Sequence, residues 1–144
     1  MDEFSLIDRI AARTRARADV ALGIGDDCAL LVPPPGQVLA VTADTLNAGV
    51  HFPAETTPYD IGWKALAVKL SDLAAMGARP VWCTLSLSLP AADPHWLAGF
   101  IEGLFALADA AGIAVVGGDN TRGPLSIAIT AMGVVPAGTA LRRD

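Results

Sequence analysis

The sequence is poor in positive charge, cysteine and aromatic residues, and each shortage excludes a class of protein. Lys and Arg number 10 against 15 Asp and Glu, for a net charge of -5, so the basic face of a nucleic-acid-binding protein is not expected. Cys28 and Cys83 are too few for a disulfide framework or a zinc site. We interpret both as buried thiols of a cytoplasmic protein. Aromatic residues make up 6%, so the core must consist mainly of aliphatic side chains.

A hydrophobic run long enough to span a membrane is also lacking. The longest uncharged segment, residues 123–141, is broken by glycines and prolines, which favours a core strand with turns over a membrane span. Asp2 and Glu3 stand where a secretory signal would carry basic residues, so no signal peptide is expected. The 144 residues are 53% hydrophobic and 17% charged, which is typical of one domain with a well-buried core.

The spacing of apolar residues predicts helices packed on one sheet. Helices are expected over residues 3–14 and 58–77 and between Asp93 and Gly112, because apolar positions recur every three or four residues and capping residues flank the two longer ones. Strands are expected over residues 28–32, 38–44, 81–90, 113–120 and 125–135. This order predicts an α+β fold in which helices cover one face of a mixed or mainly antiparallel sheet.

Four acidic residues lie at strand ends or inside apolar segments, where a rigid scaffold presents chemistry. Asp27 precedes a strand, Asp44 ends one and Asp119 follows one, whereas Asp72 lies inside a nearly apolar helix. Each has an ordinary alternative when taken alone. Asp27 could cap a turn, Asp119 could form an Asx-turn, and Asp72 could pair with Lys69 three residues earlier.

Taken together, these carboxylates have few neighbouring Lys or Arg residues in the sequence and therefore need another cation. Mg²⁺ prefers one or two carboxylates together with water and substrate phosphates, so metal ions could join this acidic protein to a nucleotide. No Walker A motif occurs, and "GIGDDC" lacks the third glycine of a dinucleotide-binding loop. Close approach of the backbone to phosphate would come from Gly-Gly-Asp at 117–119.

Five ordered motifs resemble those of the thiamine-monophosphate kinase family: "GIGDDCALL", "TADTLNAGVHF", "DIGWKALAVKLSDLAAMGA", "GGDNTRGPLSIAIT" and "GVVPAGTALRRD". The resemblance covers essentially the whole chain. It implies the ATP-binding N-terminal half of that family, and kinship with the superfamily of aminoimidazole ribonucleotide synthetase and selenophosphate synthetase. It also implies the fold of that superfamily's N-terminal domain.

The resemblance implies roles for individual residues. The implied Mg²⁺ ligands are four carboxylates and one hydroxyl: Asp27, Thr42, Asp44, Asp72 and Asp119. The implied nucleotide contacts are Gly118, Asp119 and Arg143, and the implied contact with thiamine phosphate is His51. Asp26 is expected either to contact a metal ligand from behind or to support the turn before the strand.

Three positions depart from the family pattern. Ala43 stands where a hydroxyl residue is usual, Lys69 replaces a usual Asn, and Asn120 replaces a usual Thr. None of these changes removes a proposed carboxylate. The resemblance implies a second domain of comparable size after the last motif, and we expect that domain to be absent from this chain.

The resulting expectation is Mg²⁺- and ATP-dependent phosphorylation of thiamine phosphate to thiamine diphosphate. Residues 1–144 would be the ATP- and Mg²⁺-binding, dimerising N-terminal domain. A homodimer is expected because the strands at 81–90 and 125–135 offer more apolar surface than two helices can cover. The alternatives are a non-catalytic, dimerising nucleotide-binding module and a related ATP-dependent synthetase of the same superfamily.

Overall fold

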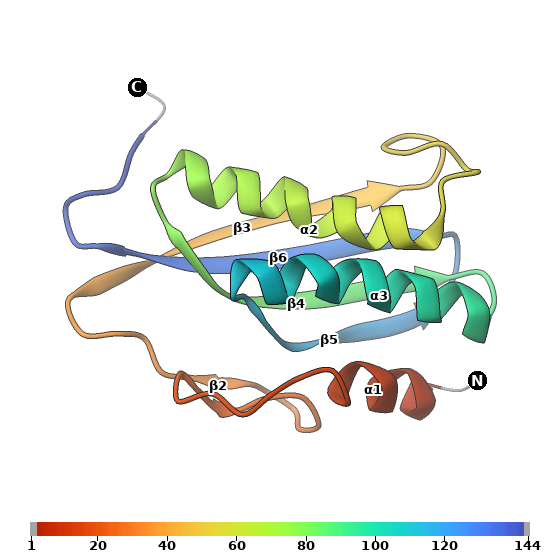
Figure 1. Ribbon diagram of the computed structural model, residues 1–144, viewed down its shortest axis with the longest axis horizontal. Helices are drawn as coiled ribbons and strands as arrows, with labels where there is room; N and C mark the ends of the chain where they lie inside the picture. The colour runs from red at the N-terminus through yellow and green to blue at the C-terminus, as the bar shows by residue number, and fades with distance from the viewer. Residues whose placement is uncertain (1–2, 143–144) are drawn as a thin grey trace.

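The computed structural model describes residues 3–142 and shows a sheet with two long helices on one face (Figure 1). The elements in chain order are α1 (Glu3–Ala11), β1 (Val20–Leu22), β2 (Leu30–Leu31), β3 (Gln37–Asn47), α2 (Pro58–Ala75), β4 (Arg79–Leu89), α3 (Pro94–Ala111), β5 (Ala114–Arg122) and β6 (Ser126–Pro136).

The main sheet has the strand order β3-β6-β4-β5. β6 pairs antiparallel with both β3 and β4, whereas β5 pairs parallel with β4 after the crossover through α3. One row of paired residues crosses the whole sheet, from Asp44 through Ile129 and Leu85 to Gly118. The predicted α+β class, with a mixed sheet and helices on one face, is confirmed.

The hairpin of β1 and β2 forms a separate two-stranded sheet that differs from the prediction. The strand expected at 28–32 is reduced to Leu30–Leu31, and its partner Val20–Leu22 was not predicted. Three residues are too few for an alternating pattern to be recognised in the sequence. Cys28 lies in the bend between these strands and is exposed, so the prediction of two buried thiols is wrong for Cys28 and confirmed for Cys83.

Local sequence signals begin and end the long helices. The Thr57 hydroxyl accepts a hydrogen bond from the Asp60 N–H at 3.2 Å, and the Asp93 carboxylate caps α3 in the same way. The C-cap of α3 is Gly112 in the left-handed conformation, with φ 71°. These caps confirm the two helices predicted from the sequence.

The helices α2 and α3 touch along a line of glycines. A Cβ atom on Gly103 would overlap the Tyr59 carbonyl oxygen, and one on Gly62 would overlap the Phe100 carbonyl oxygen. Only the absence of side chains allows the two backbones to approach so closely. The pair of helices is thereby held over the sheet as one layer.

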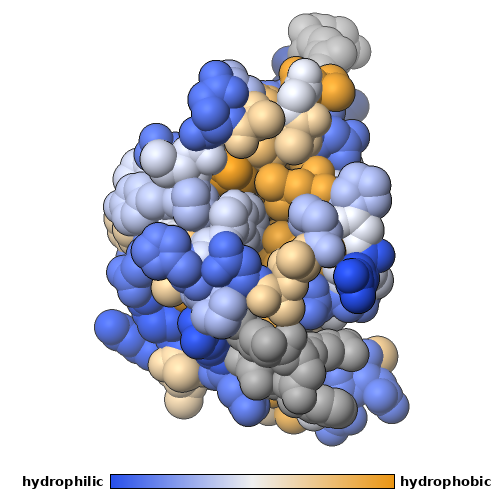
Figure 2. All heavy atoms as spheres, turned by 90° about the vertical axis from the view of Figure 1, so that its right-hand side faces the viewer, coloured by the Kyte–Doolittle hydropathy of each residue, from blue (hydrophilic) through white to orange (hydrophobic). Residues whose placement is uncertain are grey.

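The opposite face of the sheet is only partly covered. The β1–β2 hairpin packs over the buried Trp82, but Leu39 and Val41 of β3 are 49% and 61% exposed. Seen from the end where β3 terminates, hydrophobic side chains gather in a hollow bordered by polar ones (Figure 2).

Within residues 3–142, no helix is both long enough and apolar enough to cross a membrane.

Candidate functional site

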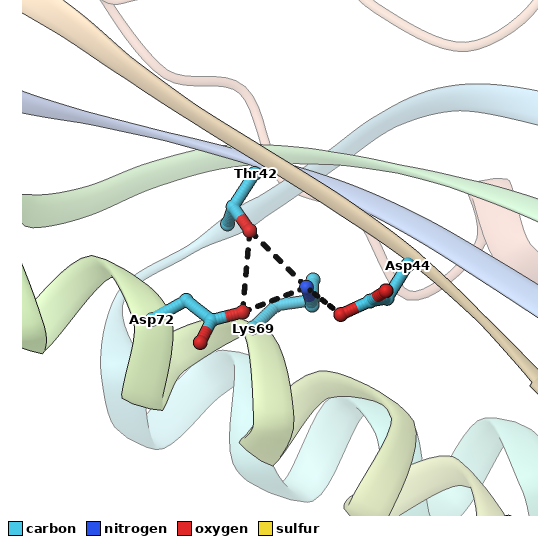
Figure 3. A network of polar contacts seen from close by, with 4 residues as sticks. All are labelled: Thr42, Asp44, Lys69 and Asp72. Carbon is cyan, nitrogen blue, oxygen red and sulfur yellow. Dashed lines mark hydrogen bonds and ion pairs between the residues drawn. The ribbon is translucent and has the colours of Figure 1, made fainter.

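Four polar side chains meet where β3 passes beneath α2. Thr42 and Asp44 are two residues apart on β3 and therefore project from the same face of the strand. Lys69 and Asp72 are three residues apart on α2 and share one side of the helix. We refer to these four residues as the Lys69 group (Figure 3).

The Lys69 ammonium lies at the centre of this group. Its Nζ donates to Asp44 Oδ2 and Asp72 Oδ2, each at 2.8 Å, and to Thr42 Oγ1 at 3.1 Å. The Thr42 hydroxyl donates in turn to Asp72 Oδ2 at 3.2 Å. All three side chains that accept from Lys69 are residues that the resemblance implies as metal ligands.

Burial distinguishes the cation from its partners. Lys69 is 1% exposed, whereas the side chains of Asp44 and Asp72 are 62% and 49% exposed. Burial alone would lower the pKa of Lys69, but the hydrogen bonds to Asp44 and Asp72 outweigh it and raise that pKa. The hydrogen bond from Lys69 lowers the pKa of Asp72. The ion pair is therefore intact at neutral pH.

The electrostatic part of the sequence interpretation needs correction here. The sequence indicated that the carboxylates lack compensating basic residues, which is wrong for Asp44 and Asp72 because Lys69 pairs with both. The ordinary alternative for Asp72, an ion pair with Lys69 one turn earlier, is present in the structure.

A second acidic group lies at the opposite edge of the sheet, beside the outer strand β5. Asp27 and Asp119 line a cavity of about 580 Å³ bounded by α1, the loop after β1 and strand β5. Asp26 Oδ1 accepts from the Asp27 N–H at 2.8 Å, and Asp119 Oδ1 accepts from the Asn120 N–H at 2.9 Å. Asp26 therefore supports the turn that carries Asp27, which is one of the two roles expected for it.

Gly118 lies in the same cavity wall and has a packing reason to be glycine. Its φ is 152°, and a Cβ atom there would overlap the Leu85 carbonyl oxygen of the paired strand. The close approach of β5 to β4 therefore requires glycine at this position. A contact between Gly118 and a nucleotide stays a prediction.

The predicted metal ligands thus form two groups. Asp44 lies on one outer strand and Asp119 on the other, with two strands between them. Three strand spacings amount to about 14 Å, whereas Mg²⁺ binds oxygen at roughly 2 Å. A single ion cannot be shared between the two groups within this chain.

The two groups fit a magnesium ion differently. Asp27 and Asp119 offer two carboxylates beside a cavity, which suits an ion that keeps its waters and binds phosphate. In the Lys69 group, the oxygens that face inward already accept from an ammonium, so Mg²⁺ does not fit between them. Among residues 3–142, no three His, Cys, Asp or Glu side chains are grouped to hold a metal ion.

His51 lies in the turn after β3, apart from both groups. Its Nδ1 accepts from the Asn47 N–H at 2.9 Å, and its carbonyl accepts from Lys64 Nζ. With Nδ1 accepting, the neutral ring carries its proton on Nε2. Lys64 was given no role by the sequence analysis, and no signal in the sequence separates it from other surface lysines. Arg143 lies outside the described residues.

The fold and its two groups define an α+β domain with acidic side chains on both outer strands of a mixed sheet. Residues 25–135 match the family described as "AIR synthase related protein, N-terminal domain". The chain belongs to this family, which confirms the superfamily expected from the sequence motifs.

Several relatives are similar over nearly the whole chain. The thiamine-monophosphate kinase of Salmonella typhimurium is 55% identical over 143 residues, which are 99% of this chain and 44% of that protein. The thiamine-monophosphate kinase of Escherichia coli K12 has the same identity and coverage. The chain therefore spans less than half the length of these relatives.

Solved structures agree with the sequence comparison. The crystal structure of thiamine-monophosphate kinase from Stenotrophomonas maltophilia superposes with a TM-score of 0.90 at 66% identity, covering 100% of this chain and 46% of that one. The structure described as AaThiL complexed with AMPPCP and TMP has a TM-score of 0.68 at 30% identity, covering 93% of this chain and 42% of that one.

Proposed function

We propose that this chain is the ATP-binding N-terminal part of a kinase that phosphorylates thiamine phosphate to thiamine diphosphate with Mg²⁺. The observation that carries the proposal is the meeting of Asp27 and Asp119 at one cavity. These residues come from segments far apart in the sequence, and each belongs to a motif of the resemblance. The solved relative described as complexed with AMPPCP and TMP supports ATP and thiamine phosphate as the two substrates.

The chemistry suits these residues. Phosphoryl transfer asks a protein to orient two partners and to neutralise charge, and it needs no covalent nucleophile. Asp27 and Asp119 would hold Mg²⁺, which would supply positive charge to the phosphate oxygens. Gly118 and Arg143 would contact the nucleotide, and His51 would contact the thiamine phosphate.

The test is binding of AMPPCP to the 144-residue chain by calorimetry, with Mg²⁺ and then with EDTA. We expect binding with Mg²⁺, loss of binding with EDTA, and at least a tenfold weaker affinity in Asp119→Asn. The matched control is Asp109→Asn, which removes the same charge from an exposed position on α3. Undiminished binding in EDTA, or equal affinities of the two variants, would contradict the proposal.

The proposal includes a homodimer formed through the open face of the sheet. Thr42 and Asp44 face α2, so Leu39 and Val41 project from the opposite face, where they are 49% and 61% exposed. Apolar strand surface of this kind normally pairs or is covered. Val41→Lys should shift sedimentation toward the monomer, whereas Val50→Lys, in a turn beyond β3, should not. A wild-type monomer at micromolar concentration would count against the dimer.

Two further points stay proposals. A cytoplasmic location is supported by the free thiols of Cys28 and Cys83. A non-catalytic, dimerising nucleotide-binding module is the second candidate function, because the cavity lined by Asp27 and Asp119 would serve nucleotide binding alone equally well. Nucleotide binding without thiamine diphosphate formation would favour that module.

A further inference from the structure

The Lys69 group contains its own cation at the place where the resemblance implies a metal ion. Lys69 Nζ lies between Asp44 Oδ2 and Asp72 Oδ2 and also contacts the Thr42 hydroxyl. We propose that the Lys69 ammonium takes the place of a divalent cation here, so that Thr42, Asp44 and Asp72 bind no metal ion between them.

The hydrogen bonds of Lys69 leave it no unused donor. An ammonium carries three N–H groups, and it has three acceptors, at 2.8, 2.8 and 3.1 Å. The side chain is also only 2% exposed. Neither an unsatisfied donor nor contact with water therefore draws the ammonium out of the group.

The backbone holds the donor and acceptors in register. Thr42 and Asp44 are alternate residues of a strand that pairs along its whole length with β6. Lys69 and Asp72 lie one turn apart on the 18-residue helix α2. The arrangement is thus built from two regular elements of the fold, a fully paired strand and a long helix.

An added divalent ion would have to displace the ammonium. Mg²⁺ needs carboxylate oxygens at about 2.0–2.1 Å, and the oxygens between Asp44 and Asp72 already face Nζ (Figure 3). Two cations held between the same carboxylates would repel each other strongly. Asn, which the resemblance to the family implies at position 69, carries no charge and would leave both carboxylates open to a metal ion.

The consequence is a different distribution of metal within the domain. Two carboxylates and one ammonium leave the Lys69 group with a net charge of -1, whereas two carboxylates with a divalent ion in place of the ammonium would have a net charge of zero. Divalent metal would then bind at Asp27 and Asp119, at the opposite edge of the sheet. The Lys69 group would hold β3 and α2 together through ion pairs and hydrogen bonds that need no metal ion.

The test counts Mn²⁺ ions bound by the 144-residue chain without nucleotide, using the electron paramagnetic resonance signal of free Mn²⁺. We expect Lys69→Asn to bind one Mn²⁺ more than the wild type, and Asp44→Asn added to that variant to remove the extra ion. The matched control is Lys64→Asn on the same helix, which should leave the count unchanged. An equal count in wild type and Lys69→Asn would overturn the proposal.

A second measurement does not depend on how well Lys69→Asn folds. With Lys69 in place, Asp44→Asn should leave the Mn²⁺ count unchanged, whereas Asp119→Asn should lower it. A lower count in Asp44→Asn alone would overturn the proposal, because it would place a metal ion on that carboxylate. The readout is metal binding and not phosphoryl transfer, so this inference can fail while the proposed kinase function is confirmed, and the reverse.

Discussion

The indole Nε1 of Trp82 donates a hydrogen bond to the Asp19 carbonyl at 3.1 Å, and this contact ties the β1–β2 hairpin to the open face of the sheet. Trp82 is completely buried there, although it shares its strand face with Thr84 and Ser86. The hairpin leads into the turn that carries Asp27, so anchoring it also positions one wall of the candidate site.

Replacing Trp82 by Phe should destabilise the protein by about 1–3 kcal/mol, because it removes the hydrogen bond and leaves a gap in a packed interface. Trp63→Phe is the matched control, since Trp63 is 41% exposed, and it should change stability by less than about 0.5 kcal/mol. Urea unfolding followed by circular dichroism measures both. Equal stabilities of the two variants would show that the Trp82 contact contributes nothing.

Gly103→Ala should destabilise the protein by about 1–3 kcal/mol through overpacking, even though alanine favours a helix by up to about 1 kcal/mol over glycine. The new methyl group would overlap the Tyr59 carbonyl, which belongs to a backbone that cannot move without shifting α2. Gly99→Ala, one turn earlier, meets the side chain of Pro58 at 3.1 Å and should cost less. Thermal unfolding would disprove the argument if Gly103→Ala were the more stable variant.

The Arg17–Asp19 pair should contribute stability that is lost in acid. Arg17 Nε and Nη2 donate to the Asp19 carboxylate at 2.9 and 2.8 Å and lower its pKa below 3.8. Since the pKa is lower in the folded state, the contribution is present above the unfolded value and disappears as pH falls through the folded value. The free energy of unfolding should therefore decrease less between pH 6 and pH 3 in Asp19→Asn than in the wild type.

Arg17→Gln provides a second check of the same pair, because it removes the guanidinium charge and keeps the carboxylate. It should flatten the acid limb of the stability profile to a similar extent. A wild-type slope in both variants would mean that this partly exposed pair contributes nothing measurable, as many surface pairs do.

A polypeptide of residues 1–144 alone should form thiamine diphosphate much more slowly than a full-length relative, because it corresponds to 44% of the length of the relatives named above. Orientation of both reactants supplies much of the rate in such reactions, and each factor of ten corresponds to about 1.4 kcal/mol. The measurement is thiamine diphosphate formed from ATP, Mg²⁺ and thiamine phosphate. Turnover equal to that of the full-length enzyme would refute this expectation.

Features that depend on a few neighbouring residues could be predicted from the sequence. Thr57 and Asp93 begin helices and Gly112 ends one because capping acts within a single turn. The ordered motifs likewise indicated the family, since they can be recognised without knowing any contact. Only the short strand at Val20–Leu22 was missed among the elements, because its pattern is too short to recognise.

The tertiary structure decided which charged side chains meet. Lys69 could be recognised in the sequence as a departure beside Asp72, but its contact with Asp44 depends on how α2 docks across β3. The same holds for Asp27 and Asp119, which share a cavity only because the hairpin and β5 lie side by side. Spacing along the chain determines neighbours within an element, whereas the distance between elements is set by packing of the whole core. For this reason the sequence predicted one acidic cluster in need of metal, and the structure contains two groups, one of which is paired with a lysine.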